Sequence, residues 1–311
     1  MVSEIAEPVS PDLIEQELIS KFWVRNFRGI DIYCFTASQA PNTTNEIGRI
    51  REIEFRAEGG GTGKPIDLDT FDQEEPQYSQ IIGWDPVNKE IVGMYRLQCL
   101  GGALDEQKQQ LSSPTAKLFQ FSSTFLNEKA SETIELGRSV VNRSAKKAIL
   151  GLAAVWAGIG ALVSENHGIK FLFGKFTTYP DYPRPVRSAL YRFLHIHCPD
   201  NQNLITPKDE LNQNFYMDDC PEETFLGTSF EKDYETLELI AKQNNVTLPP
   251  LVISYLNLSS TMKVFGTALN KNFGNVLETA MMITVADINE KNRKRFIESY
   301  ESINPRVFDS V

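Results

Sequence analysis

TIELGRSVVNRSAKKAILGLAAVWAGIGALVSENHGIKFLFGKF, residues 133–176, is the stretch that decides the fold. Its opening residues are rich in β-branched and apolar side chains and predict a strand over 133–141. Sixteen residues without a charged side chain follow at 148–163, and a second apolar run lies at 169–176. Strand, helix and strand in this order predict a βαβ-like unit, in which the helix packs on one face of a sheet.

The central helix of this unit raises the question of a membrane span. Its apolar run at 148–163 is shorter than the about 20 residues that a spanning helix needs. Lys146, Lys147 and Glu165 flank the run closely. Because a helix that is apolar on all sides is usually buried inside a protein, we expect a buried core helix.

Further strands and helices are predicted on both sides of this unit. Alternating apolar residues indicate strands over 29–36, 78–85, 89–100, 263–269 and 276–286. Helical periodicity and capping residues indicate helices over 11–22, 43–58, 249–259 and 287–300. Residues 177–248 are interpreted as a helical insertion. We therefore expect a single domain over 1–311 with an α/β (α+β) fold built on a mixed sheet.

Composition and charge exclude several classes of protein. Of 311 residues, 41% are hydrophobic and 23% charged, which is typical of a globular domain. A net charge of −10 argues against nucleic-acid binding, which requires a basic surface. The four cysteines have no CxxC spacing and indicate reduced thiols. Residues 1–21 have no apolar core, so we expect no signal peptide and a cytoplasmic protein.

Three motifs suggest other chemistries but do not complete their patterns. GGGTGK, at 59–64, has Glu58 and Pro65 where a phosphate-binding loop requires glycine and a hydroxyl residue. His195, His197 and the nearby cysteines have no known metal-ligand spacing, so we expect no metal site. No GxSxG or Cys/His signature is present, which leaves no candidate nucleophile for covalent hydrolysis.

Charged residues inside apolar strands are the informative exceptions. Arg96 lies in IVGMYRL, and Glu135 and Arg138 lie in TIELGRSVV. Regular alternation places Glu135 and Arg138 on opposite faces, whereas a β-bulge, common beside active sites, brings them to the same side. The alternative is a structural ion network of Arg96, Glu135 and the Asp-rich loop at 58–77.

The turn NRSAKKA, at 142–148, is a candidate anion site. It leads into the long apolar helix, and a helix N-terminus attracts anions. Arg143, Lys146 and Lys147 add positive charge, which suits a pyrophosphate or the phosphate of phosphopantetheine. The alternative is a solvated turn that happens to be basic.

Taken together, these segments resemble one family of acyltransferases. The motifs are IEFRAE with Arg56, DLDTFD with Asp69 and Asp72, IVGMYRL, ELGR, HGIKFLFG (167–174) and PPLVISYLNLSSTMKVFG (249–266). They resemble the ornithine lipid and glycine lipid synthases, often labelled hemolysin-like, of the GNAT superfamily. This family is distantly related to the acyl-homoserine lactone synthases. The resemblance covers about 47–180 and 249–286.

The resemblance implies a fold and a set of residue roles. The fold is GNAT-like, a central twisted mixed sheet that splays in its middle and carries helices on both faces. Glu135 deprotonates the acceptor amine, and Asp69 and Asp72 hold the ammonium or order the acceptor loop. Arg138, Arg96 or Arg56 binds the acceptor carboxylate or locks the acidic loop. Backbone amides near Ser139 and Val141 donate to the thioester oxygen, and Arg143, Lys146 and Lys147 meet the donor phosphate.

The implied reaction is acyl transfer from a thioester to the amine of an amino acid, giving an N-acyl amino acid or a lyso amino-acid lipid. No tightly bound cofactor is implied, and the donor is acyl carrier protein or acyl-CoA. The usual GNAT glycine-rich signature is absent, which leaves the choice of donor open. The implied location is the cytoplasm, and peripheral contact with the inner face of the cytoplasmic membrane is left open.

Three alternatives to this reaction remain. The first is a coenzyme A-dependent acetyltransferase acting on a small polar amine. The second is an acyl-homoserine lactone synthase, which GGGTGK disfavours because it replaces an aromatic-containing loop. The third is a GNAT-fold binding protein without catalysis. The acceptor, the acyl length, the role of 200–245 and the oligomeric state stay open.

Overall fold

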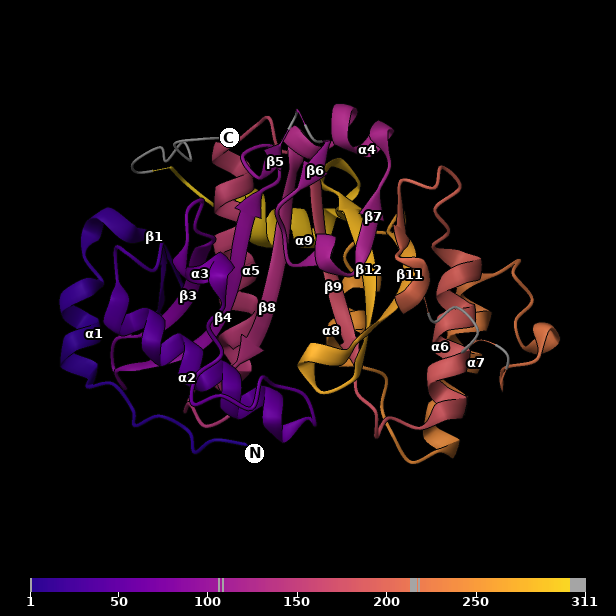
Figure 1. The fold of residues 1–311 in the computed structure, drawn as a ribbon, viewed down its shortest axis with the longest axis horizontal. Helices are drawn as coiled ribbons and strands as arrows, with labels where there is room; N and C mark the ends of the chain where they lie inside the picture. Colours follow the sequence, from indigo (N-terminus) through magenta and orange to yellow (C-terminus); the bar gives the residue numbers. More distant parts are fainter. Residues whose placement is uncertain (1, 106, 108, 213–216, 218, 303–311) are drawn as a thin grey trace.

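A computed structural model describes residues 2–105, 107, 109–212, 217 and 219–302. Within these ranges one large mixed sheet has the strand order β1-β2-β3-β4-β8-β9-β12-β11 (Figure 1). Its strands are β1 (Trp23–Phe27), β2 (Ile30–Phe35), β3 (Ser79–Asp85), β4 (Glu90–Cys99), β8 (Thr133–Val141), β9 (Phe171–Thr178), β11 (Lys263–Asn270) and β12 (Val276–Thr284). The unit predicted from residues 133–176 forms its centre.

The sheet opens between β8 and β9. These two strands are parallel, whereas the other neighbouring strands of the sheet pair antiparallel. Their pairing covers only Thr133–Leu136 with Phe171–Gly174, although both strands continue beyond it. Figure 1 shows them side by side at the top of the view and separating toward the bottom. The expected mixed sheet that splays in its middle is confirmed.

Helices cover both faces of the sheet. Successive strand residues point to opposite faces. Ile81 of β3 packs in the cluster that contains α5 (Ala148–Glu165), whereas its neighbour Ile82 packs with Ile47 of α2 (Pro41–Ala57). The expected helices on both faces are therefore confirmed.

Helix α5 is the core helix that its sequence predicts. By length and composition it could cross a membrane, and no other helix in the described ranges meets that test. However, 61% of its 18-residue span is buried in the protein. Gly151 lies so close to β4 that a Cβ atom there would be 2.3 Å from the carbonyl oxygen of Val92. Glycine therefore permits the close packing of α5 on the sheet.

The remaining elements surround this core. The other helices are α1 (Pro11–Glu17), α3 (Thr70–Gln73), α4 (Ser123–Glu128), α6 (Arg184–His197), α7 (Phe230–Gln243), α8 (Pro250–Leu256) and α9 (Glu290–Arg293), which continues as a π-helical turn over Lys294–Glu298. Two small sheets pair β5 (Leu104–Asp105) with β6 (Gln110–Leu111) and β7 (Phe119–Phe121) with β10 (Ile205–Pro207). Figure 1 shows α6 and α7 beside β11. Within 177–248, residues 213–216 and 218 lie outside the described residues.

The predicted helix over 11–22 is wrong beyond Glu17. The helix α1 ends there, and the edge strand β1 follows after a short 3₁₀ turn. The sequence of β1, WVRNF, has two adjacent polar residues and no clear alternation. Pairing with β2 therefore determines that these residues form a strand, and the local sequence pattern alone does not reveal it.

Candidate active site

A β-bulge in β8 lies where the sheet opens. Arg138 and Ser139 of β8 together oppose Tyr95 of β4. Arg138 takes a left-handed backbone conformation with a φ of 52°, which is uncommon for a residue with a side chain. The extra residue interrupts the alternation of faces, and Glu135 and Arg138 line the same cavity. Of the two arrangements that the sequence left open for this strand, regular alternation or a bulge, the structure has the bulge.

A cavity of about 800 Å³ occupies the opening between β8 and β9. Its charged lining residues include Asp69, Arg96, Glu135, Arg138, Lys175 and Glu278. Its apolar lining residues include Leu118, Leu136, Val140, Leu152, Phe176 and Leu251. An apolar wall with a few convergent polar groups is typical of a site for a small molecule.

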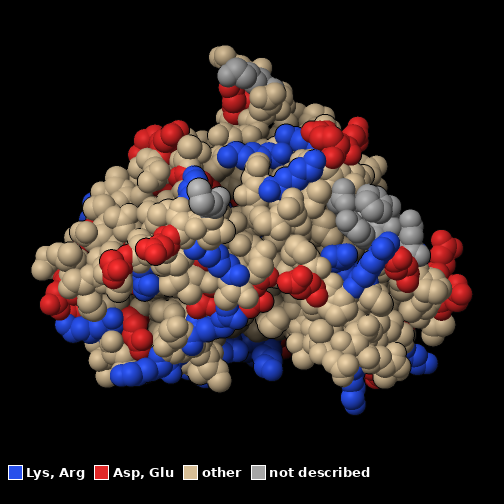
Figure 2. Space-filling view, turned by 60° about the horizontal axis from the view of Figure 1, so that its bottom comes forward, with Lys and Arg blue, Asp and Glu red and all other residues tan. Residues whose placement is uncertain are grey.

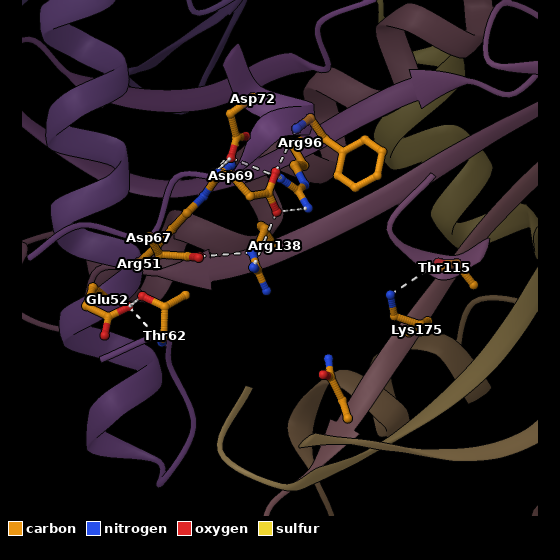
Figure 3. A network of polar contacts seen from close by, with 12 residues as sticks. Arg51, Glu52, Thr62, Asp67, Asp69, Asp72, Arg96, Thr115, Arg138 and Lys175 are labelled. Atoms are coloured by element: carbon orange, nitrogen blue, oxygen red, sulfur yellow. Dashed lines mark hydrogen bonds and ion pairs between the residues drawn. The ribbon is translucent and has the colours of Figure 1, made fainter. Parts of the chain in front are cut away.

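Arg96 joins two aspartates of the loop that precedes β3. Its Nη1 and Nη2 atoms donate to Asp69 at 2.7 and 3.0 Å, and Nη1 also donates to Asp72 at 3.0 Å (Figure 3). Asp69 begins α3 with a capping box, in which its side chain accepts from Phe71 N–H and Asp72 accepts from Asp69 N–H. The network therefore fixes the acidic loop against β4.

Two residues of this network, Arg51 and Asp67, were not predicted from the sequence. Arg51 is fully buried, and its Nη1 lies 3.1 Å from Asp72. Burial opposes the ionisation of Asp72, but Arg51 and Arg96 outweigh it and lower its pKa. Burial raises the pKa of Asp67, although Oδ2 of Asp67 lies 2.9 Å from Nε of Arg138. Asp72 and Arg51 are not among the lining residues of the cavity, which suggests that they support the loop.

Arg138 extends from the bulge toward the cavity (Figure 3). Its Nη2 lies 3.6 Å from Asp69 Oδ2, and its Cζ lies 4.4 Å from the ring centre of Phe273 and 5.6 Å from that of Phe55. With Nε facing Asp67 and aromatic rings nearby, the Nη atoms are directed toward the cavity. A guanidinium placed in this way suits a carboxylate or a phosphate.

Glu135 has no ion pair with Arg96 in the part of the chain that the structure describes, in contrast to the structural network considered above. It is 2% exposed. Tyr78 donates its hydroxyl to Oε2 at 2.9 Å, and Thr115 donates its hydroxyl to Oε1 and its N–H at 3.3 Å. Burial, reinforced by Glu135, raises the pKa of Tyr78 well above its usual value, so the phenol stays a donor.

A second ion pair lies on the wall formed by β9 and β12. Lys175 Nζ is 3.0 Å from Glu278 Oε2 and donates to Thr115 Oγ1 at 3.2 Å. Asn270 donates to the other oxygen of Glu278 at 2.9 Å. In Figure 3, Lys175 and Arg138 lie on opposite sides of the open space. Neither Lys175 nor Glu278 was predicted from the sequence, although each interrupts an apolar strand in the same way as Arg96.

Arg56 does not reach the cavity lining in the described ranges. Its Nε donates to Glu52 at 2.7 Å, and its other nitrogens donate to the carbonyls of Ser3 and Lys64. Glu52 also accepts from Thr62, through N–H at 3.0 Å and Oγ1 at 2.8 Å. Hydrogen bonds to the buried carboxylate of Glu52 therefore hold the GGGTGK loop, and Arg56 of α2 bonds to its Lys64 carbonyl.

The three cations of the basic turn before α5 do not all face the same way: one lines the cavity and two face the β3–β4 turn. Arg143 lines the cavity and forms ion pairs with Glu54 of α2 and with Glu58, the residue that directly follows α2. Lys146 donates to Asn88, and Lys147 donates to Asp85 at 3.0 Å, so both face the β3–β4 turn. Figure 2, turned so that the open end of the sheet comes forward, shows Lys and Arg side chains along its lower edge among acidic ones.

Ser139 and Val141 lie on the wall of the cavity. Within the described residues, β8 pairs with β9 only as far as Leu136. From Gly137 onward, one backbone edge of β8 therefore borders the opening instead of another strand. Such an edge offers N–H groups to a ligand.

The histidines and cysteines do not form a metal site in the described ranges. No group of three or more His, Cys, Asp and Glu residues is placed there to hold an ion. His197 instead bonds to Asp233 at 2.8 Å and joins α6 to α7.

Comparison with known proteins identifies the family. The acetyltransferase (GNAT) domain family matches residues 50–156. A glycine N(alpha)-acyltransferase of Phocaeicola vulgatus is 40% identical over 98% of this chain and 96% of its own length. A protein of the same name from Bacteroides thetaiotaomicron is 39% identical over 98% of this chain and 92% of its own length. No solved structure matches the chain.

The likeness to these relatives extends over nearly the whole chain, and the matched domain contains β4, the bulge of β8 and the first half of α5. The chain therefore belongs to the family of these two relatives, the GNAT-superfamily N-acyltransferases, and is an acyltransferase.

Proposed function

We propose that this enzyme transfers a fatty acyl group from a thioester to the amine of glycine and so makes an N-acylglycine, a lyso amino-acid lipid. Both relatives carry glycine in their names. The observation that carries the proposal is the cavity in the splay, where Glu135 and Arg138 face the same space as a row of apolar side chains. That combination suits a small zwitterion and a long hydrocarbon chain.

The acceptor binds near the bulge. Arg138 takes the glycine carboxylate on its Nη atoms, because a planar guanidinium matches a carboxylate in a two-point contact. Asp69 lies 3.6 Å from Nη2 of Arg138 and attracts the ammonium. The cation of the site then faces the carboxylate of the amino acid, and the anion of the site faces its ammonium group.

Glu135 acts as the base. It takes a proton from the glycine ammonium, directly or through water, and the freed nitrogen lone pair attacks the thioester carbonyl carbon. The C–N bond forms, and the C–S bond breaks with its electron pair leaving on sulfur. A second proton passes from nitrogen to the thiolate, and the proton on Glu135 is released to solvent. Each turnover yields an amide, a thiol and one proton.

The donor lies along β8, with its acyl chain against the apolar wall. Backbone N–H groups near Ser139 and Val141 polarise the thioester oxygen. Arg143, with Lys146 and Lys147 beyond it, attracts the phosphate of phosphopantetheine, carried by acyl carrier protein or coenzyme A. We place the reaction in the cytoplasm, with its lipid product delivered to the inner face of the membrane.

The test is a reaction with purified protein, glycine and a fatty acyl thioester on either carrier, followed by mass spectrometry. We expect N-acylglycine from the wild type and a loss of at least about 100-fold in rate for Glu135→Gln. Glu132→Gln, which changes a carboxylate paired with Lys170 just before β8, serves as the matched control and should keep the wild-type rate.

Other outcomes would support the alternatives. Acetylation of a polar amine from acetyl-CoA, without fatty acyl transfer, would point to a small-molecule acetyltransferase. Consumption of S-adenosylmethionine would point to a lactone synthase. Full activity of a folded Glu135→Gln variant would remove Glu135 from the mechanism.

A further inference from the structure

A continuous chain of polar groups joins the two halves of the splayed sheet beneath the cavity. It runs from Tyr78 through Glu135 and Thr115 to Lys175 and then to Glu278. Each of these side chains is at least largely buried: Lys175 is 16% exposed, and Glu278 is 6% exposed. Of the three N–H donors of the Lys175 ammonium, one faces Glu278 and another is given to Thr115, so Lys175 links the carboxylate of β12 to the hydroxyl that contacts Glu135.

The chemistry of the groups fixes the direction of the hydrogen bonds. An ammonium donates and cannot accept, so the Lys175–Thr115 bond must use the Thr115 oxygen as the acceptor. The Thr115 proton is then directed away from Lys175, toward Oε1 of Glu135. Tyr78 donates to Oε2. In the part of the chain that the structure describes, the groups that hydrogen-bond to the carboxylate are consequently all donors, which fixes its orientation from both oxygens.

We propose that Lys175 is a positioning residue for acyl transfer: through the Thr115 hydroxyl it holds the Glu135 carboxylate in the orientation that faces the acceptor amine. This inference rests on the proposed function, in which Glu135 accepts the ammonium proton. Lys175 itself does not touch the reacting atoms. Its role is to set the direction of these hydrogen bonds, and the role of Glu278 is to hold Lys175 in place.

The same geometry determines where Glu135 carries the proton. When Glu135 becomes protonated, Thr115 cannot turn its hydroxyl toward Lys175, because the ammonium accepts no hydrogen bond. Among the described residues, the Tyr78 hydroxyl has no such constraint from a cation at its own oxygen, and it can rotate about its C–O bond away from Oε2. The transferred proton therefore forms its O–H bond at Oε2, as the N–H bond of the ammonium breaks, and it leaves from there to solvent.

The neighbouring charges agree with this arrangement. Burial opposes ionisation of Glu278, but Lys175, Asn270 and Arg138 lower its pKa, so Lys175 keeps an anionic partner. Other charged or titratable groups of the cavity wall include Arg96, which lies over the Tyr78 ring, Arg138, Lys117 and Tyr179. Arg96 and Arg138 are themselves paired with aspartates of the acidic loop, Asp67, Asp69 and Asp72.

The experiment compares Lys175→Met, Lys175→Arg and Thr115→Val with the wild type. For each, kcat and the KM for glycine are measured from about pH 4 to about pH 9, because the ordinary pKa of a glutamate carboxyl is about 4.3 and the acid limb of a carboxylate base must lie inside the range. We expect Lys175→Met and Thr115→Val to lower kcat by about 10- to 100-fold with little change in KM. Their acid limb should move to higher pH by about one unit, because a charge or donor that favours the anion is lost. Lys175→Arg should retain most of the wild-type profile.

Two controls separate this role from a purely structural one. Lys170→Met removes an exposed lysine just before β9 and should change neither kcat nor the acid limb. Lys175→Met/Glu278→Gln removes both charges, so that no unpaired carboxylate is left buried, and should show the same shifted limb while folded.

The outcomes are distinguishable. If the wild type forms no N-acylglycine, the proposed function fails and this inference with it. If the wild type is active and a folded Lys175→Met enzyme keeps its kcat and its acid limb, only the inference on Lys175 is overturned. Loss of folding in both the single and the double variant would also overturn it, in favour of a structural ion pair.

Discussion

Arg138 stands at a left-handed backbone position in the bulge of β8, and two aromatic rings lie near its guanidinium. The bulge directs this side chain into the cavity, while Asp67 occupies its Nε side. A lysine could supply the charge from the same position, but it could not supply two parallel donors.

We therefore expect Arg138→Lys to raise the KM for glycine by about 10- to 100-fold, the value of a charge-assisted hydrogen bond. The KM for the acyl donor should change little. Steady-state kinetics with glycine as the varied substrate measures this. Arg184→Lys, at an exposed arginine of α6, is the control. An unchanged KM for glycine would show that the carboxylate binds elsewhere.

Part of the site could be predicted from single residues. A charge inside an apolar strand indicated Arg96, Glu135 and Arg138, and all three line the cavity. The same reasoning applies to Lys175 in IKFLFGKF and Glu278 in VLETAMMIT, where it was not used. Tyr78 and Thr115 could not be found in this way, because they are uncharged residues whose importance comes only from tertiary contacts with Glu135.

At the scale of elements, the packing of α5 on β4 depends on close approach of two backbones. A Cβ atom on Gly151 would meet the Val92 carbonyl oxygen at 2.3 Å, a distance that backbone movement must relieve.

We expect Gly151→Ala to lower the free energy of unfolding by about 1–3 kcal/mol, as overpacking of a core does, despite the higher helix propensity of alanine. Urea denaturation measures the change. Gly168→Ala, at a position where a Cβ atom meets nothing within 4 Å, should be close to neutral. Equal stability of the two variants would show that α5 and β4 can separate without cost.

Elements with a strong pattern could be predicted from the sequence. The strand at 133–141 coincides with β8, and the strand over 78–85 agrees with β3 to within one residue. The edge strand β1 was missed because its polar residues hide any alternation, and pairing with β2 determines it. The splay between β8 and β9 came from the family resemblance, since where two strands stop pairing depends on the packing around them.

At the scale of the whole molecule, the buried acidic network links folding to pH. Arg51 and Arg96 outweigh burial and hold the pKa of Asp72 below its usual value. A carboxyl with a lowered folded pKa stabilises the protein above its unfolded pKa, about 3.9, and this stabilisation is lost as pH falls toward the folded pKa.

We expect Asp72→Asn to lower the free energy of unfolding at neutral pH by about 3 kcal/mol, because two buried arginines lose a partner. The variant should also lose less stability than the wild type between about pH 5 and about pH 2. Urea unfolding at a series of pH values tests this. Asp12→Asn, at an exposed surface carboxylate, should follow the wild-type curve. Parallel curves for Asp72→Asn and the wild type would contradict the linkage.

The short pairing of β8 and β9 also gives the molecule a direction in which it bends. Four residue pairs form the seam between the half of the sheet that contains β1–β4 and β8 and the half that contains β9, β12 and β11. A plate joined along so short a seam is less stiff across it than along either half. We therefore expect the width of the cavity to change more readily than the shape of either half-sheet, so that a small rotation about this seam would admit a long acyl chain while each half-sheet keeps its hydrogen bonds.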